Sequence, residues 1–218
     1  MELDYCFHGT SFDNAKKILK TKNVYTNINP ISNKVINKVF EKNKNGKIYI
    51  SGMEGVKRNI GSIGLGFYAF HYNENNAILF AKKMKRQRKY TGNSSVLIFK
   101  IKNGFEQNIL DFTDHKINEM YHLFLENYQD VAEFIKKNYK FTNNTAAKKL
   151  DGIMIEGFIR AIQMEHNTEI LAAYSFTLNE IGVNLEKTTM LNSYELSIRN
   201  NKIIDYDTIS LKEIREEG

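Results

Sequence analysis

The stretch from residue 95 to residue 102 constrains the fold of this chain most strongly. Its residues alternate as in a β-strand, yet both sets of alternate positions are rich in apolar side chains. A strand that is apolar on both faces lies inside a sheet whose two faces are covered, so we expect a central strand here. Its apolar residues are Val96 and Ile98 on one face and Leu97, Phe99 and Ile101 on the other.

Other segments predict shorter strands and several helices around this central strand. Alternating or short apolar runs predict strands at residues 3–7, 47–50, 64–70, 109–112, 151–157 and 192–200. Apolar residues at helical spacing predict helices at residues 11–19, 31–40, 77–84, 115–139 and 167–180, and residues 53–63 predict a mobile loop. Strands and helices follow each other without a regular βα rhythm, and no repeat or linker divides the chain. We therefore expect one α+β domain over residues 1–218.

The composition is typical of a folded protein of a reducing compartment. The 218 residues are 42% hydrophobic and 12% aromatic, which excludes a disordered chain. The single cysteine, Cys6, excludes an internal disulfide framework. No apolar run reaches membrane-spanning length and the first residues do not resemble a signal peptide, so we expect a cytoplasmic protein without membrane contact. The net charge of +6 is compatible with a polyanionic partner but does not require one.

The first segment with a functional interpretation is Phe7-His8-Gly9-Thr10. It ends a predicted strand and precedes a helix that begins with the capping residues Ser11 and Asp13. A histidine at a strand end, followed by a glycine that allows close approach to the backbone, is suited to holding a small molecule. The same tetrapeptide is also a common way to leave a strand.

The second segment runs from Gly64 to Phe70, where two glycines lead into an aromatic strand with Tyr68, and a helix follows. A glycine-rich turn before an ordinary core strand has the same pattern. Six of the eight residues from Lys82 to Lys89 are basic and surround the end of that helix. Such a run is usually a solvated helix end favoured by the helix dipole, and the alternative is a contact with nucleic acid.

The third segment is the predicted strand at residues 192–200. Tyr194, Leu196 and Ile198 alternate there with Glu195, Ser197 and Arg199. Glu195 therefore lies on a polar face of the strand. Most glutamates on such a face only increase solubility.

Histidines elsewhere do not form a metal site in this interpretation. His115 and His122 lie seven residues apart in a predicted helix, and no cluster of cysteines or carboxylates accompanies them at ligand spacing. We expect no metal ion.

Taken in their order, the three segments resemble the His-Tyr-Glu class of ADP-ribosyltransferases, which includes diphtheria toxin and the poly(ADP-ribose) polymerases. The resemblance is also to the small bacterial toxins and phage-defence enzymes of that superfamily. It implies a split β-sandwich of two small, mostly antiparallel sheets with flanking helices. It also implies a mono-ADP-ribosyltransferase that uses NAD⁺ as co-substrate, and an antitoxin or regulatory partner that restrains it.

The resemblance assigns roles to residues of this sequence. His8 would bind the adenosine ribose, Gly9 the nicotinamide carboxamide, and Tyr68 one face of the nicotinamide ring. Thr10 would also belong to the NAD-binding residues. Phe80 is the candidate for the other ring face, and Glu195 would bind the nicotinamide ribose and stabilise the transition state. Independently of the resemblance, the basic run on the helix after the Tyr68 strand makes Lys82, Lys83, Lys85 and Arg86 candidates for contact with the acceptor.

Two positions depart from the patterns of this superfamily. Asn76 stands where many polymerase relatives have a small hydroxyl residue that contacts the carboxamide, and an asparagine amide can still form that hydrogen bond. Ser193, two residues before Glu195, is not a carboxylate, so the Gln/Glu-x-Glu pattern of the arginine-modifying class is absent.

Four alternatives remain open at the level of sequence. The acceptor is a protein or, almost equally well, a nucleic acid. The chain is an enzyme or a non-catalytic nucleotide-binding module of the same fold. An RNA 2′-phosphotransferase shares the fold but needs a set of basic phosphate-binding residues that the sequence does not display. Finally, the chain is an unrelated α+β domain in which His8 and Glu195 never meet.

Overall fold

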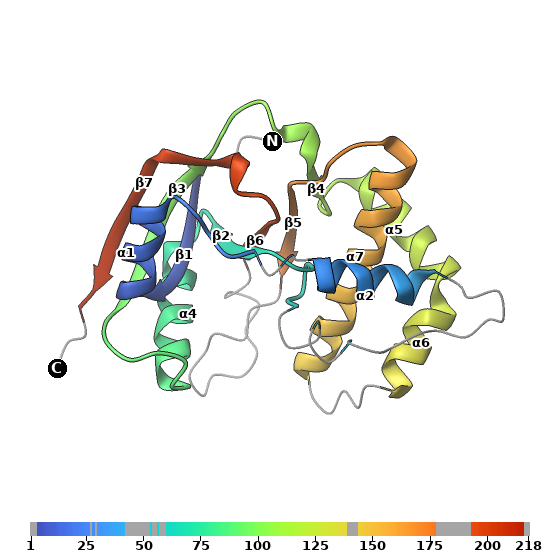
Figure 1. Cartoon of the computed structure of the whole chain (residues 1–218), viewed down its shortest axis with the longest axis horizontal. Helices are drawn as coiled ribbons and strands as arrows, with labels where there is room; N and C mark the ends of the chain where they lie inside the picture. Colours follow the sequence, from blue (N-terminus) through green and yellow to red (C-terminus); the bar gives the residue numbers. More distant parts are fainter. Residues whose placement is uncertain are drawn as a thin grey trace.

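The protein is described by a computed structural model covering residues 4–26, 28, 30–41, 53, 56, 60–138, 144–177 and 193–215. Its strands form one mixed sheet of seven strands in the order β4-β5-β6-β2-β1-β3-β7 (Figure 1). The bounds are β1 Tyr5–Ser11, β2 Phe67–His71, β3 Ser94–Ile101, β4 Ile109–Asp111, β5 Ala172–Thr177, β6 Ser193–Ile198 and β7 Ile204–Ile214. Only the β4–β5 pair is parallel. The α+β class is confirmed, whereas the strands form one sheet and not the two predicted.

Six α-helices lie among the described residues: α1 Phe12–Thr21, α2 Pro30–Phe40, α4 Glu74–Arg86, α5 His115–Asn127, α6 Gln129–Asn138 and α7 Asn144–His166. Helices α1 and α4 pack against β1 and β3. Helices α2, α5 and α6 all contact α7 and gather with it beside β4 and β5 (Figure 1). The described chain thus has helices at both ends of its sheet.

The β3 strand lies inside the sheet, between β1 and β7, as its sequence predicts. Leu97 and Phe99 are buried in the core cluster that contains Ala15 and Ile18 of α1. On the opposite face, Val96 packs in the cluster that contains Ala77 of α4. Burial on both faces explains why alternate positions of this strand are apolar in both sets.

Side-chain caps fix where α1 and α4 begin. The Ser11 hydroxyl accepts a hydrogen bond from the Asn14 N–H, and the Asn73 side chain accepts one from the Asn76 N–H. Each cap satisfies one of the backbone donors left unpaired in the first turn of a helix. The helices therefore start immediately after the two strands that carry His8 and Tyr68.

Two predicted elements are wrong in type. Residues 151–157, predicted as a strand, lie within α7, and residues 172–177, within the predicted helix 167–180, form β5. A short apolar run does not distinguish a strand from a buried helix. Two glycines of this segment allow close packing of α7. A Cβ at Gly152 would lie 1.9 Å from the Gly61 carbonyl oxygen, and one at Gly157 2.3 Å from the Phe40 ring.

Two helix bounds also differ. The single helix predicted over residues 115–139 is two helices, because the backbone leaves the helical conformation at Tyr128 (φ −119°, ψ 26°). Helix α4 ends at Arg86, before the basic run does. The predicted strand at 47–50 lies outside the described residues, and so do residues 54, 55 and 57–59 of the predicted loop at 53–63.

Candidate functional site

The sheet opens between β1 and β2. These antiparallel strands pair only at Cys6–His71 and Phe7–Phe70, although β1 remains paired with β3 as far as Ser11. Strand β2 meanwhile stays paired with β6 from Phe67 onward. Beyond Phe7 the two strands therefore separate, and His8 lies at the point where they part.

His8 joins the two strands across this opening. Its Nδ1 lies 2.6 Å from the Tyr68 carbonyl oxygen, and its ring centroid lies 4.0 Å from that of Phe67. A carbonyl oxygen only accepts hydrogen bonds, so Nδ1 carries the proton. Burial lowers the pKa of His8 to about 4, against the effect of this hydrogen bond. The imidazole is therefore neutral at pH 7, and Nε2 is an acceptor for a hydroxyl group.

Gly9 brings α4 close to β1. A Cβ at this position would lie 2.0 Å from the Ala77 carbonyl oxygen. The Tyr72 N–H donates to the Tyr5 carbonyl at 3.3 Å, so the polar backbone groups of Tyr5 face β2. Backbone groups alternate in direction along a strand, which turns those of Gly9 toward the opening as well. Both the N–H and the carbonyl of Gly9 are thus directed into the opening.

Thr10 lies at the far end of β1 and contacts α1. Its hydroxyl oxygen accepts a hydrogen bond from the Asn14 side chain at 2.9 Å, and its carbonyl accepts one from the Ser95 hydroxyl at 3.4 Å. These contacts give Thr10 a structural role in joining β1 to α1 and β3.

The Tyr68 side chain is anchored by the turn that precedes β2. Its hydroxyl donates to the Gly64 carbonyl at 2.7 Å and accepts from the Ile63 N–H at 3.0 Å. A Cβ at Gly61 would lie 2.4 Å from the ring carbon Cζ, so the ring lies directly on this backbone. Burial, and then the negative charge of Glu195, raise the pKa of the Tyr68 hydroxyl well above its usual value. The ring orientation is therefore fixed by its own turn.

Glu195 lies on the same sheet face as Tyr68. Its neighbours across the ladder are Phe70 on β2 and Ser175 on β5, and Tyr68 faces Ser197 in the same register. Residues directly opposite on antiparallel strands share a face. Glu195 is 8% exposed, and its Oε2 accepts a hydrogen bond from the Ser62 hydroxyl at 3.4 Å. The polar face predicted for this strand is thus buried, and Glu195 is not a solubilising surface residue.

Asn76 and Phe80 belong to α4, above the same face. Asn76 is 2% exposed. Phe80 is half-buried, with its ring 6.2 Å from that of Phe70 in a T-shaped contact. Because Phe70 is the cross-strand neighbour of Glu195, Phe80 lies on the Glu195 side of the sheet.

The basic run forms the last turns of α4 and the turn after it. Lys82, Lys83 and Lys85 are half-buried, and Arg86, the last residue of the helix, is exposed. The Tyr90 hydroxyl donates to the Ala81 carbonyl at 2.7 Å and holds the following chain against the helix. These cations follow Phe80 directly along α4, on the side of the helix C-terminus, where the dipole favours positive charge.

The turn at residues 61–66 depends on a buried ion pair that sequence reasoning missed. Glu156 of α7 is fully buried and binds the Arg199 guanidinium through both carboxylate oxygens. Glu156 Oε1 also accepts from the Leu65 N–H at 2.7 Å, and Arg199 and Ser197 donate to the Leu65 carbonyl at 3.3 and 3.1 Å. The pair therefore holds the turn whose backbone binds the Tyr68 hydroxyl.

Glycines allow the backbone of this turn to lie close to the side chains of Glu156 and Ser197. Gly64 has φ +90°, a conformation that residues with a side chain rarely adopt, and a Cβ there would lie 2.5 Å from Glu156 Oε1. A Cβ at Gly66 would lie 2.2 Å from the Ser197 hydroxyl oxygen. The glycines of the second sequence segment thus shape a turn that the sequence alone did not connect with Glu156.

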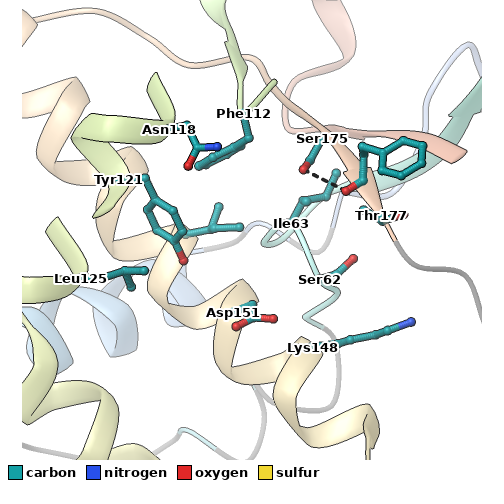
Figure 2. Close-up of a pocket in the computed structure, with 12 residues that line it drawn as sticks. Ser62, Ile63, Phe112, Asn118, Tyr121, Leu125, Lys148, Asp151, Ser175 and Thr177 are labelled. Carbon is teal, nitrogen blue, oxygen red and sulfur yellow. Dashed lines mark hydrogen bonds between the residues drawn. The ribbon is translucent and has the colours of Figure 1, made fainter. Parts of the chain in front are cut away.

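A pocket of about 380 Å³ adjoins Glu195 (Figure 2). It lies between α5, α7 and β5, and the turn before β2 closes it with Ser62 and Ile63. Ser62 lines the pocket and also donates to Glu195, and Ser175 lines it as the cross-strand neighbour of Glu195. The pocket is therefore linked to Glu195 by the Ser62 hydrogen bond, and Ser175 lies beside Glu195 on the neighbouring strand.

His71 gives the fold a dependence on pH. It is 2% exposed, its Nδ1 lies 2.9 Å from the Tyr174 hydroxyl, and burial lowers its pKa to about 4 against the opposing charge of Asp4. The unfolded chain takes up a proton below about pH 6.5, whereas the folded chain resists it until about pH 4. Stability is therefore complete above pH 6.5 and falls between 6.5 and 4, by at most about 3 kcal/mol for this residue.

We expect His71→Phe to flatten this pH dependence, because the variant has no group that must remain neutral in the folded state. Urea unfolding of both proteins at several pH values between about 7.5 and 4.5 measures the difference. The pKa of His8 is lowered in the same direction and contributes equally to both proteins. Equal slopes for the wild type and the variant would show that His71 is not held neutral.

Neither a metal cluster nor a membrane helix is found in the described part of the chain. Within it, no group of three or more His, Cys, Asp or Glu side chains is placed to hold a metal ion. Likewise, none of the helices described is both long and apolar enough to cross a membrane.

Comparisons of the chain with family models, with curated proteins and with solved structures gave no match. The interpretation of the site therefore depends on its own geometry and chemistry. In these terms, the opening of the sheet is bordered by the neutral His8 imidazole, which lies against Phe67, and by the backbone groups of Gly9. The fixed Tyr68 ring lies on the other face of the sheet. The buried carboxylate of Glu195 lies on the neighbouring strand.

Proposed function

We propose that this protein is an NAD-dependent mono-ADP-ribosyltransferase that moves ADP-ribose from NAD⁺ to a macromolecular acceptor. The observation that supports this most is the convergence of three distant segments at one opening. His8 and Tyr68 border the separation of β1 and β2, and Glu195 lies buried on the next strand, on the face that carries the Tyr68 ring. Their order along the chain matches that of the His-Tyr-Glu transferases.

The residues at the opening suit the parts of NAD⁺. The Gly9 N–H and carbonyl match the two functions of a carboxamide, which needs one donor and one acceptor. The nicotinamide ring of NAD⁺ is cationic and planar, and the face of an aromatic ring such as Tyr68 attracts it. His8 Nε2 would accept a hydrogen bond from a ribose hydroxyl.

In this reaction the bond between C1′ and the nicotinamide nitrogen breaks, and its electron pair leaves with neutral nicotinamide. A lone pair of the acceptor forms the new bond to C1′, and the acceptor loses a proton. Positive charge grows on C1′ and the ring oxygen as the first bond stretches, as in glycoside hydrolysis. The Glu195 carboxylate would bind the 2′-hydroxyl and stabilise this charge, and its burial shields the interaction from water.

Incubation of the purified chain with NAD⁺ labelled in its adenylate half, with and without a cell lysate, tests the proposal. Release of nicotinamide reports bond cleavage, and separate protease and nuclease digestion identifies the class of acceptor. Binding of NAD⁺ without any cleavage would indicate a binding module of this fold. Absence of both binding and cleavage would contradict the proposal.

Tyr68 offers a graded test of NAD⁺ binding. Tyr68→Phe keeps the ring but loses the hydrogen bonds to Gly64 and Ile63, so we expect lower stability by about 1 kcal/mol and nearly unchanged affinity. Tyr68→Ala also loses the ring, and we expect affinity to fall by a further 0.5–1.5 kcal/mol, roughly two- to twelvefold. Calorimetry with NAD⁺ and thermal melts separate the two effects. An equal loss of affinity in both variants would show that the ring does not contact the ligand.

The cations of α4 would contact the acceptor. Replacing Lys82, Lys83, Lys85 and Arg86 with glutamine would then reduce transfer more than hydrolysis of NAD⁺. If transfer were unaffected, these residues would only complement the helix dipole.

We further propose a cytoplasmic toxin or defence effector, since an unrestrained transferase would damage its own cell. An antitoxin or another regulatory partner would keep it inactive. Harmless overexpression of an active chain in the absence of such a partner would contradict this role.

A further inference from the structure

The pocket beside Glu195 has an apolar aromatic side and a polar side. Phe112 and Tyr121 meet at the apolar side with their ring centroids 5.2 Å apart in a T-shaped contact. Figure 2 shows Asn118 and Tyr121 on α5 across the cavity from Asp151 on α7, while Lys148 of α7 extends below Ser62. Tyr121 and Asp151 line the same part of the cavity in Figure 2, and burial and then the charge of Asp151 raise the pKa of the Tyr121 hydroxyl.

These groups specify the chemistry of a ligand. A carboxylate such as Asp151 only accepts hydrogen bonds, so the ligand must present N–H or O–H donors to it. The aromatic side favours a flat ring. The ammonium group of Lys148, on the same helix as Asp151, favours a negative charge nearby and disfavours a cationic side chain such as arginine. A flat ring with N–H donors and an adjacent negative group describes a nucleotide.

The size and position of the pocket agree with a nucleotide as its ligand. Small-molecule sites span about 300–1,000 Å³, and a pocket of about 380 Å³ has more room than one amino-acid side chain fills. Ser62 connects the pocket directly to the Glu195 carboxylate. A base bound in the pocket would thus lie on the far side of Glu195 from α4, and another part of the same nucleic-acid strand would have to reach the cations of that helix. The net charge of +6 also favours a polyanion over a basic peptide.

We propose that this pocket binds the acceptor, and that the acceptor is a nucleobase with an exocyclic amino group in a single-stranded nucleic acid. The proposal rests on the proposed transferase function. Asp151 accepts a hydrogen bond from the amino group of the base. As the amino nitrogen bonds to C1′ and nicotinamide departs with the electron pair of the broken bond, Asp151 takes the proton that this nitrogen loses. Enzymes that act on bases generally draw an unstacked base into such a pocket.

The test uses short oligo-dT strands that carry one central guanine, adenine or cytosine, with plain oligo-dT as the control because thymine has no exocyclic amino group. The purified full chain, Asp151→Asn and Glu165→Gln are each given NAD⁺ labelled in its adenylate half. Label on the oligonucleotide and release of nicotinamide are both measured. Glu165 is an exposed acid on the same helix, outside the pocket, and is the matched control.

We expect label on at least one of the three substituted strands and none on plain oligo-dT. Loss of a charged acceptor costs about 1.5–3 kcal/mol, so the ratio of transfer to hydrolysis should fall at least tenfold in Asp151→Asn. Glu165→Gln should leave the ratio unchanged. Cleavage of NAD⁺ with label only on protease-sensitive material would show that the acceptor is a protein and not a nucleobase. The proposed transferase function would still hold. An equal loss in both variants would overturn the placement of the acceptor in this pocket.

Absence of all NAD⁺ cleavage would contradict the proposed transferase function. Whether the pocket binds a base is then tested separately, by measuring binding of the oligonucleotides. Fluorescence anisotropy of the same strands, without NAD⁺, measures affinity for the three proteins. Weaker binding in Asp151→Asn alone would support a base-binding pocket. Equal binding in all three would overturn it.

Discussion

Glu195→Gln is expected to lower the rate of ADP-ribose transfer by about 100- to 1,000-fold. The glutamine has nearly the same shape, and its side-chain oxygen can still accept the hydrogen bond from Ser62. It lacks the negative charge that would stabilise the cationic transition state. Because Glu195 is 8% exposed, water replaces little of that lost stabilisation. NAD⁺ affinity, in contrast, should change little, since the charge acts mainly in the transition state.

Initial rates of nicotinamide release and of label transfer measure this effect, with calorimetry for NAD⁺ affinity and a thermal melt for folding. Glu213→Gln is a matched control, since it makes the same change at an exposed position on β7. A Glu195→Gln variant that kept more than about a tenth of wild-type activity would have lost under about 1.4 kcal/mol. Such a small loss would assign catalysis to another group.

The local parts of the site were predictable from sequence, whereas their arrangement was not. The motif around His8 and the aromatic strand with Tyr68 are continuous segments, and β1, β2 and β6 lie where these patterns predict strands. The opening between β1 and β2 lies within a long-range arrangement, because β2 lies between β1 at the start of the chain and β6 near its end. No local periodicity encodes such a long-range pairing.

Two other parts of the site, the Glu156–Arg199 ion pair and the pocket, were missed because the secondary structure of their segments was predicted wrongly. Glu156 belonged to a segment interpreted as a strand, so its position on the inner side of α7 against Arg199 could not be inferred. The same error concealed the pocket, two of whose walls come from α7 and from β5, which was predicted to be helical. In both cases the local sequence fitted either a strand or a buried helix, and tertiary packing decided the conformation.

Glu156→Gln is expected to destabilise the fold by about 3–5 kcal/mol, a large part of the 5–15 kcal/mol typical of a native domain. The variant leaves the Arg199 guanidinium buried without its carboxylate, and an amide nitrogen in place of one carboxylate oxygen would face further donors. It also weakens the support of Leu65, and with it the turn that holds the Tyr68 hydroxyl. Urea unfolding of the variant against the wild type measures the loss.

The double variant Glu156→Met with Arg199→Met separates the charge from the packing. Removing both charges leaves no buried ion unpaired, and replacement of a buried pair by apolar residues of similar volume is often neutral or stabilising. We therefore expect the double variant to be more stable than either single variant, with a coupling energy within about 0.5–3 kcal/mol. If the two single losses simply added, the pair would not act as a unit. In that case Arg199 would support the turn through its bond to the Leu65 carbonyl alone.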